Sequence, residues 1–322
     1  MAIIAGIDEA GFSPVVGPMV VSAAVFRVPD ESVNQDLWRK LSSAVTRKGF
    51  RKSSAIGIAD SKLMHVRDDG VVHLERGLLG MLHQKAPAPR SLRELLQLVC
   101  PQIPVEMEAY PWYAGGDMPL PRLADWQDLS LRSKALTAAM KRHEIVFEGL
   151  RSEPVLAGRY NQLVGATRNK SVALFGVVAQ LIDWICRAFD AGDGPTRIIV
   201  DHQGGRVRYL EPLQNIFDGA SINILEETET RSRYLISVHG RSIEISFLVG
   251  GETACLATAL ASMSCKYVRE LFMELLNGYF ARHVPGLAPT TGYHTDGQRF
   301  VESALPILQQ QGLDKNLLVR CW

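Results

Sequence analysis

Nearly continuous apolar runs alternate along the chain with segments of helical periodicity. The runs at residues 2–8 and 18–27 are too uniformly apolar for exposed hairpin arms, so we expect two strands in the centre of a sheet. Shorter apolar runs predict further strands at 144–147, 196–201, 221–225 and 242–249. Because helical segments separate these strands, the pattern favours a mixed α/β sheet flanked by helices over a barrel.

Apolar residues at helical spacing predict the helices. We expect them at about 30–45, 69–84, 123–142, 169–189 and 207–217. The run from Ala254 to Cys265 differs, because nine of its twelve residues are Ala, Ser, Thr or Cys. A helix with such small side chains can lie very close to a sheet, and it would hold the preceding Glu252 with little play.

Residues 85–122 interrupt this pattern with seven prolines and the pair Gly115-Gly116. Such a segment is expected to be irregular, apart from a short helix at about 91–99. We therefore predict one domain over residues 1–322, with an insertion at about 85–143. The aromatic residues of this segment include Tyr110, Trp112 and Tyr113. We expect them to cover the core, the alternative being that they stack on nucleic-acid bases.

Composition narrows the class of protein. The chain has 322 residues, of which 47% are hydrophobic, so it can bury a large core. No apolar run approaches the ~18 residues of a membrane span, and an acidic pair lies where a signal peptide would be cationic and then apolar, so we expect a cytoplasmic protein.

Five scattered cysteines include no Cys-x-x-Cys pair for zinc or redox chemistry. A net charge of +1 means that any nucleic-acid footprint must be local, and basic clusters lie at residues 47–52 and 231–241.

Four carboxylates lie at the ends of predicted strands. Asp8 and Glu9 follow the first strand, Asp201 ends the strand at 196–201, and Glu252 follows the strand at 242–249. Open α/β sheets present ligands at the carboxyl ends of their strands, so these side chains are expected to meet there. Consecutive residues of a strand point to opposite faces, so a break in the strand would be needed for both members of the first pair to reach one centre.

Gly11 and Pro14 are expected to supply that break. The alternative for this acidic stretch is a turn that closes a hairpin. If the four carboxylates do meet, they would repel one another unless divalent cations neutralised them. Oxygen ligands favour Mg²⁺ or Mn²⁺ over zinc, and two such ions would suit phosphodiester cleavage.

Five motifs resemble, in order, those of the type 2 ribonucleases H, the ribonuclease HII and HIII family. They are Asp8-Glu9-Ala10-Gly11 with Pro14 and Gly17-Pro18, Asp60-Ser61-Lys62-Leu63, Val200-Asp201, Glu252 followed by Lys266, and Gly292-Tyr293-His294-Thr295. The resemblance implies a ribonuclease H-like fold and a metal-dependent endonuclease that hydrolyses the RNA strand of RNA/DNA hybrids with two ions, leaving a 3′-hydroxyl and a 5′-phosphate. It also implies that Asp8, Glu9, Asp201 and Glu252 are the catalytic metal ligands.

The same resemblance implies a set of substrate-binding residues. They are Gly11, Phe12, Ser13, Lys62, Asn169, Lys170, Lys266 and Tyr293. For the two lysines at 62 and 266, a salt bridge to a metal-ligating carboxylate is the alternative to substrate contact.

Three features depart from the family pattern. The family has Gly-Arg-Gly or Gly-Lys-Gly where this chain has Gly11-Phe12-Ser13, so the loop expected to hold the ribonucleotide has no cation. The glutamate at 252 is like the HIII branch, whereas the N-terminal domain typical of that branch is not expected here, since the first motif begins at residue 8. We therefore expect altered discrimination at the ribonucleotide, in a monomer that acts on hybrids or on ribonucleotide-containing DNA. The alternatives are a nuclease for another nucleic-acid structure and a binding protein without turnover.

Overall fold

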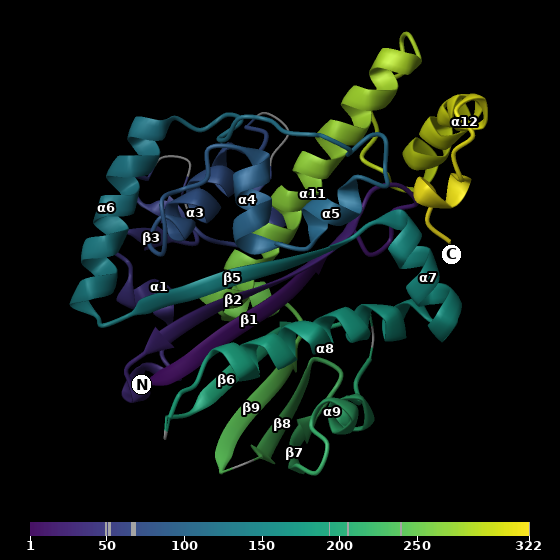
Figure 1. Ribbon diagram of the computed structural model, residues 1–322. Coiled ribbons are helices and arrows are strands. Elements are labelled where there is room, and N and C mark those ends of the chain that lie inside the picture. The colour runs from purple at the N-terminus through teal and green to yellow at the C-terminus, as the bar shows by residue number, and fades with distance from the viewer. Residues whose placement is uncertain are drawn as a thin grey trace.

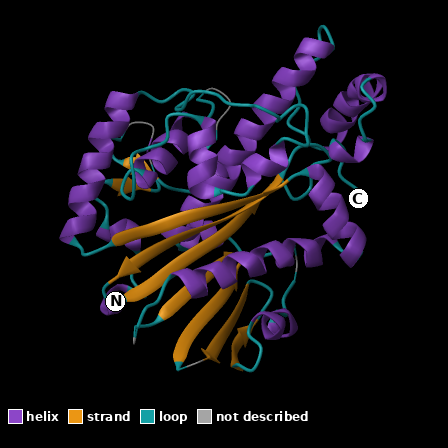
Figure 2. Cartoon of the chain, viewed as in Figure 1, coloured by secondary structure: helices purple, strands orange, loops and turns teal. Residues whose placement is uncertain are grey.

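The computed structural model describes residues 1–48, 50, 53–65, 69–192, 194–204, 206–238 and 240–321. A seven-stranded sheet lies at its centre, with strands in the order β5-β2-β1-β6-β9-β8-β7 (Figures 1 and 2). These strands are β1 (Ala2–Ala10), β2 (Met19–Val28), β5 (Val146–Val155), β6 (Thr196–Asp201), β7 (Ser221–Glu227), β8 (Arg231–Val238) and β9 (Arg241–Leu248). A separate small ribbon pairs β3 (Val45–Thr46) with β4 (Ile56–Gly57). The predicted mixed α/β sheet is confirmed.

Strand direction decides where the ends of the central strands lie. β6 pairs in parallel with β1 on one side and with β9 on the other. The remaining strands pair antiparallel, β2 and β5 beyond β1, and β8 and β7 beyond β9. The carboxyl ends of β1, β6 and β9 therefore lie at one edge of the sheet.

Helices cover both faces of this sheet. They are α1 (Leu37–Lys40), α2 (Ser61–Met64), α3 (Val72–Leu82), α4 (Leu92–Val99), α5 (Ile103–Met107), α6 (Trp126–Arg142), α7 (Ala157–Thr167), α8 (Lys170–Ala188), α9 (Leu210–Ile216), α10 (Gly251–Ala254), α11 (Leu256–His283) and α12 (His294–Gln310). Alternate residues of β1 pack into two cores: Ile3 and Ile7 join the core that contains α8, whereas Ile4 joins the core that contains α11. Figure 1 shows α8 along one face and α11 on the other.

The helix α11 packs directly on β1, as its small side chains predict. A Cβ atom added to Gly6 would lie 2.0 Å from the backbone nitrogen of Thr258 and 2.3 Å from the carbonyl carbon of Ala257. The Thr258 hydroxyl also donates to the carbonyl of Ile199 in β6, at 3.2 Å. Helix and sheet are thus in backbone contact directly below the carboxyl edge.

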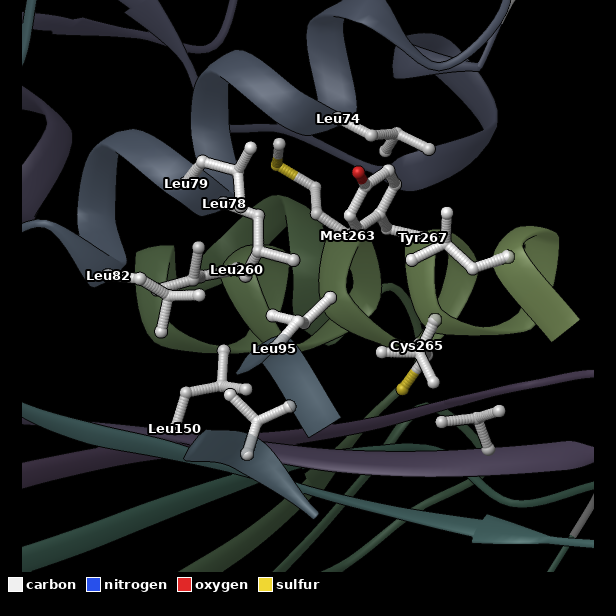
Figure 3. Close-up of a cluster of buried hydrophobic side chains, with 14 of the residues drawn as sticks. Leu74, Leu78, Leu79, Leu82, Leu95, Leu150, Leu260, Met263, Cys265 and Tyr267 are labelled. Carbon is white, nitrogen blue, oxygen red and sulfur yellow. The ribbon is translucent and has the colours of Figure 1, made fainter. Parts of the chain in front are cut away.

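Side chains from the predicted insertion contribute to the core on the α11 side. Figure 3 shows Leu95 of α4 and Leu150 of β5 close to leucines of α3 and to Leu260 and Met263 of α11. Three aromatic residues of the insertion, Tyr110, Trp112 and Tyr113, are each no more than 3% exposed. Their expected role in covering the core is confirmed, because rings buried to this extent offer no face to a nucleic-acid base.

By length and composition alone, α8 is apolar enough to cross a membrane, although the sequence pattern predicted no run of that kind. Its apolar side faces the sheet instead. Leu174, Val178, Leu181 and Ile185 are each 1% exposed or less and belong to the core beneath it. The helix therefore packs as a core helix of this domain.

Two predicted elements differ from the structure. The helix predicted at 30–45 is wrong: the carboxylate of Asp36 accepts hydrogen bonds from the backbone nitrogens of Trp38 and Arg39, which starts the four-residue α1 in its middle. The strand predicted at 144–147 is in fact β5, which continues to Val155. The elements β8, α7 and α12 were not predicted, nor were the short β3, β4, α2, α5 and α10.

We predict that Gly6→Ala destabilises the protein by about 3 kcal/mol or more, because backbone contact leaves no room for a methyl group. Urea denaturation followed by circular dichroism measures the change. Gly176→Ala is the matched control: that helical position in α8 has no atom within 4 Å of an added Cβ, so alanine should be neutral or stabilising. An unchanged unfolding midpoint for Gly6→Ala would contradict the close packing of α11.

Candidate metal site at the carboxyl edge of the sheet

The structure brings the four predicted carboxylates to the carboxyl edge of the sheet. The β1–β6 ladder ends at Ile7 and Val200, so Asp8 and Glu9 extend beyond it. Asp201 is the last residue of β6, and Glu252 lies on α10, which begins three residues after β9 ends. The backbone nitrogen of Gly251 donates to Oδ1 of Asp201 at 2.8 Å. This bond fixes the start of α10 against the end of β6.

The strand ends where the sequence placed the expected break. β1 pairs with β2 in regular register through Ala10 and Val20, and Gly11 follows with φ +78°. On the other side, the parallel β1–β6 ladder stops at Ile7 and Val200. Asp8 and Glu9 therefore lie at the end of β1, directly before the break at Gly11.

The carboxylates repel one another, and Asp201 is the neighbour they share. Burial, followed by repulsion from Glu9 and Asp201, raises the pKa of Asp8 well above its usual value. Burial, followed by repulsion from Asp201, raises the pKa of Glu9 to about 8 and that of Glu252 to about 7. Such mutual repulsion requires that these side chains lie close together.

The underlying helix and an adjacent cation partly offset this repulsion. Ser262 of α11 hydrogen-bonds the Asp8 carboxylate, and the Glu9 backbone nitrogen donates to Oδ1 of Asp8 at 2.7 Å. Cys265 donates from Sγ to the Asp8 carbonyl at 3.1 Å. The charge of the exposed Lys62 favours the ionised form of Glu9. Hydrogen bonds therefore orient Asp8, yet its pKa stays raised.

The donor set fits a divalent cation. Oε2 of Glu252 is buried and has no hydrogen-bond partner, and the oxygens around it are the ligands that Mg²⁺ and Mn²⁺ prefer. Within the described ranges, however, no three His, Cys, Asp or Glu side chains are arranged as a group that could hold a metal ion. The carboxylates thus gather at one edge without converging on a single point.

A fifth carboxylate, Asp60, lies at the same edge and was not among the predicted ligands. Its charge contributes to the raised pKa of Glu252, after the larger effects of burial and Asp201. Asp60 caps α2 by accepting from the backbone nitrogen of Lys62 at 2.9 Å. The hydroxyls of Ser262 in α11 and Ser61 form a hydrogen bond at 3.0 Å, which ties α2 to the same helix. The Asp60-Ser61-Lys62 motif is the sequence signal for this position, although only its lysine was predicted to lie in the site.

The two predicted lysines lie in different surroundings. Lys62 is exposed and close enough to Glu9 to affect its ionisation. Lys266 forms an ion pair with Glu270 one turn further along α11, at 2.7 Å. Its salt-bridge partner is therefore not one of the four predicted ligands, and substrate contact by either lysine stays a prediction.

The predicted substrate loop lies beside the site. Gly11 has φ +78°, and a Cβ added there would lie 2.6 Å from Nε of Arg269, so only glycine fits. Phe12 is half-buried against the α8 core, whereas Ser13 is exposed. The guanidinium of the buried Arg269 lies over the ring of Tyr293, 5.4 Å from its centre. Tyr293 is 42% exposed and thus has a ring that a ligand can reach.

The predicted pair at the start of α8 is a helix cap. Oδ1 of Asn169 accepts from the backbone nitrogens of Ser171 and Val172, at 2.9 and 3.3 Å. The pKa of Lys170 is lowered, first by burial and then by the charge of Arg320 near the C-terminus. Helix start and C-terminal segment are therefore close in space, and substrate contact by Asn169 or Lys170 stays a prediction.

The basic clusters of the sequence are largely neutralised where the structure describes them. In the first, Arg47 lies 3.5 Å from a carboxylate oxygen of Asp36 and donates to the carbonyl of Thr253, next to Glu252. Arg51 and Lys52 lie outside the described residues, as does His239 of the second cluster. The second cluster's arginines pair as Arg231 with Glu226, Arg233 with Glu244 and Arg241 with Asp190. Arg47 thus contacts the backbone of α10, the helix that carries Glu252.

Comparison with known proteins gives matches among solved structures. No family model and no curated protein matches the sequence. Ribonuclease HII from Archaeoglobus fulgidus, solved as a complex with PCNA, is 14% identical with a TM-score of 0.43, and ribonuclease H2 from Pyrococcus horikoshii is 15% identical with a TM-score of 0.45. Each likeness covers 99% of this chain and 93% of the other.

A third similar structure is Bst-RNase HIII in complex with Mn²⁺. It is 14% identical with a TM-score of 0.40, over 99% of this chain and 66% of the other. These three solved structures are ribonucleases of the HII and HIII kind. Likenesses this distant carry no residue roles, which come instead from the geometry described above.

We predict that the metal-free protein loses stability as pH rises from about 5 to 8. A carboxyl with a folded pKa of about 8 keeps its proton in this range, whereas in the unfolded chain it ionises near its ordinary value of 4.5. The folded state then binds more protons, so its stability falls with rising pH. Thermal melting in EDTA should show this slope, and Glu9→Gln should flatten it. Manganese should stabilise the wild type more at pH 8 than at pH 6, and a slope unaffected by Glu9→Gln would contradict the assignment.

Proposed function

We propose that this protein is a metal-dependent endonuclease of the type 2 ribonuclease H kind, which hydrolyses the RNA strand of RNA/DNA hybrids. The observation that carries the proposal is the group of carboxylates at the ends of β1, β6 and β9, all coupled through Asp201. A binding module has no use for such a group, because it would repel the phosphates of its ligand. A nuclease that binds divalent cations there has a use for every member.

Asp8 and Asp201 would hold the metal ions, Mg²⁺ or Mn²⁺, with Glu9 and Glu252 completing the sites. When bound, two such ions supply an activated water and stabilise the leaving oxygen of the phosphodiester. Asp8 suits this role because Ser262 and the Glu9 backbone nitrogen fix its orientation. The buried, unpartnered Oε2 of Glu252 is likewise preorganised to accept a cation.

The side chains around the loop at residues 11–13 support contact with nucleic acid. Lys62 places a cation next to Glu9, and Tyr293 presents an exposed ring in contact with Arg269. The half-buried Phe12 supplies no charge at the position where the family has a cation. We therefore infer that the enzyme cleaves stretches of hybrid and discriminates weakly at a single ribonucleotide embedded in DNA. Its cytoplasmic location and monomeric state stay predictions.

We predict that Asp8→Asn and Asp201→Asn each reduce Mn²⁺-dependent cleavage of an RNA/DNA hybrid at least about 100-fold, because each removes a charged metal ligand. The assay uses a labelled hybrid and resolves the products on a gel. Circular dichroism should show an intact fold for both variants. Asp183→Asn, on the exposed side of α8, is the matched control and should cleave like the wild type. Activity retained in either site variant would refute the proposal.

A second prediction concerns the altered loop. The double substitution Phe12→Arg with Ser13→Gly should raise cleavage at a single ribonucleotide embedded in duplex DNA several-fold, because it restores a cation beside the scissile phosphate. Cleavage of a continuous hybrid should change less. Comparing both substrates with plain duplex DNA also tests the alternative of a nuclease for another structure, which predicts that the DNA is cut. No gain would mean that another part of the chain already compensates for the loop.

A further inference from the structure

The C-terminal segment holds the loop at residues 11–13 through one buried arginine. Arg320 is 2% exposed and donates from Nη1 to the carbonyl of Gly11 at 2.6 Å and from Nη2 to the carbonyl of Phe12 at 2.7 Å. One planar guanidinium therefore binds two successive carbonyls, which a single ammonium group cannot match in geometry.

This contact dictates where the amides of the loop point. In a trans peptide the N–H points away from the carbonyl of the preceding residue, and both peptide bonds here are trans. With the carbonyls of Gly11 and Phe12 turned inward to Arg320, the N–H groups of Phe12 and Ser13 point outward. Neither amide donates to any atom of the described chain, and Ser13 is exposed. Adjacent, outward-facing backbone N–H groups are a type of group that binds anions in proteins.

The buried side chains behind the loop carry positive charge, which is the sign that attracts an anion. Arg269, 1% exposed, lies directly behind Gly11, and neither it nor Arg320 forms an ion pair with a described carboxylate. Buried guanidinium groups are costly without an anion nearby. The loop side chain is uncharged at Phe12, so the positive charge at this place comes from the interior.

Contacts of its backbone and of its side chain hold Arg320 in place. Its own backbone nitrogen donates to the carbonyl of Val15 at 2.9 Å, and Val319 forms a β-bridge with Val16. Its guanidinium lies 3.8 Å from the ring centre of Tyr160. The side chain amide of Asn161 donates to the carbonyl of Val319 at 2.8 Å, so α7 holds the segment from the other side.

We propose that Arg320 is a positioning residue, which turns the Phe12 and Ser13 amides outward to bind a backbone phosphate of the nucleic acid. The backbone and the interior thus replace the cation that the loop lacks. This inference rests on the proposed function for the identity of the ligand. The anion site itself can be tested without cleavage.

The experiment titrates inorganic phosphate into ¹⁵N-labelled protein and follows the amide resonances of Phe12 and Ser13. The wild type should show saturable shifts of both, and Arg320→Met should weaken the phosphate affinity about tenfold, since preorganised hydrogen bonds are lost. Arg187→Met, on an 80%-exposed side chain of α8, is the matched control and should behave like the wild type. In hybrid cleavage, Arg320→Met should raise KM about tenfold with kcat changed less than about threefold.

The outcomes separate the two proposals. If the wild type cleaves hybrids but phosphate leaves both amides unmoved, or if Arg320→Met keeps the wild-type phosphate affinity, the role of Arg320 is refuted and the nuclease proposal stands. If no hybrid is cleaved, the phosphate titration still decides the role of Arg320. Should Arg320→Met fail to fold, Arg320→Lys decides instead: it keeps the charge without the planar fork, so weakened phosphate binding supports the proposal and unchanged binding overturns it.

Discussion

The structure depends on the backbone contact between α11 and the central strands. The absent side chain of Gly6 lets the helix lie against β1, and Thr258 then bonds the backbone of β6. From the same helix, Ser262 and Cys265 bind the side chain and the backbone of Asp8. One rigid helix therefore fixes the ends of strands whose carboxylates repel each other. Without that constraint, repulsion would separate them in the metal-free protein.

The neighbouring region is assembled from distant parts of the chain. The segment from Gly11 to Val16 follows β1, and it contacts the turn at Gly292, the buried Arg269 and the C-terminal Arg320. The backbone nitrogen of Val15 donates to the carbonyl of Gly292 at 2.9 Å. The charge needed beside a phosphate can thus come from the interior when the loop itself has none. The acidic pair Asp8-Glu9 is therefore followed, within three residues, by a loop whose backbone contacts two buried arginines.

Much of the fold could be predicted because its central strands are strongly apolar. β1, β2 and the middle of β6 are buried on both faces, whereas β9 alternates buried Ile243, Ile245 and Phe247 with more polar residues. The ends of β1, β6 and β9 identify the four carboxylates. The strand β8 was missed because its arginines read as a basic cluster. In the structure Arg231 and Arg233 alternate with buried Ser232 and Tyr234, and they pair with carboxylates of the neighbouring strands. Pairing between strands is not visible in one segment alone.

The site was predictable only in part, for a similar reason. The four strand-end carboxylates follow from local pattern, but Asp60 reaches the same edge because Ser61 of α2 bonds Ser262 of α11, 201 positions away. Arg320 contacts a carbonyl 309 positions earlier in the chain, and no periodicity encodes such a contact. The ion pair of Lys266 with Glu270, by contrast, follows from the spacing of four residues on one helix, so the sequence alone could have predicted it.

The most direct measurement is an anomalous difference map from crystals soaked in Mn²⁺. We predict density for manganese at the carboxyl edge of the sheet, bounded by Asp8, Glu9, Asp201 and Glu252, and its loss in crystals of Asp201→Asn. Manganese that binds elsewhere, or that leaves this edge empty at saturating concentration, would contradict the central claim.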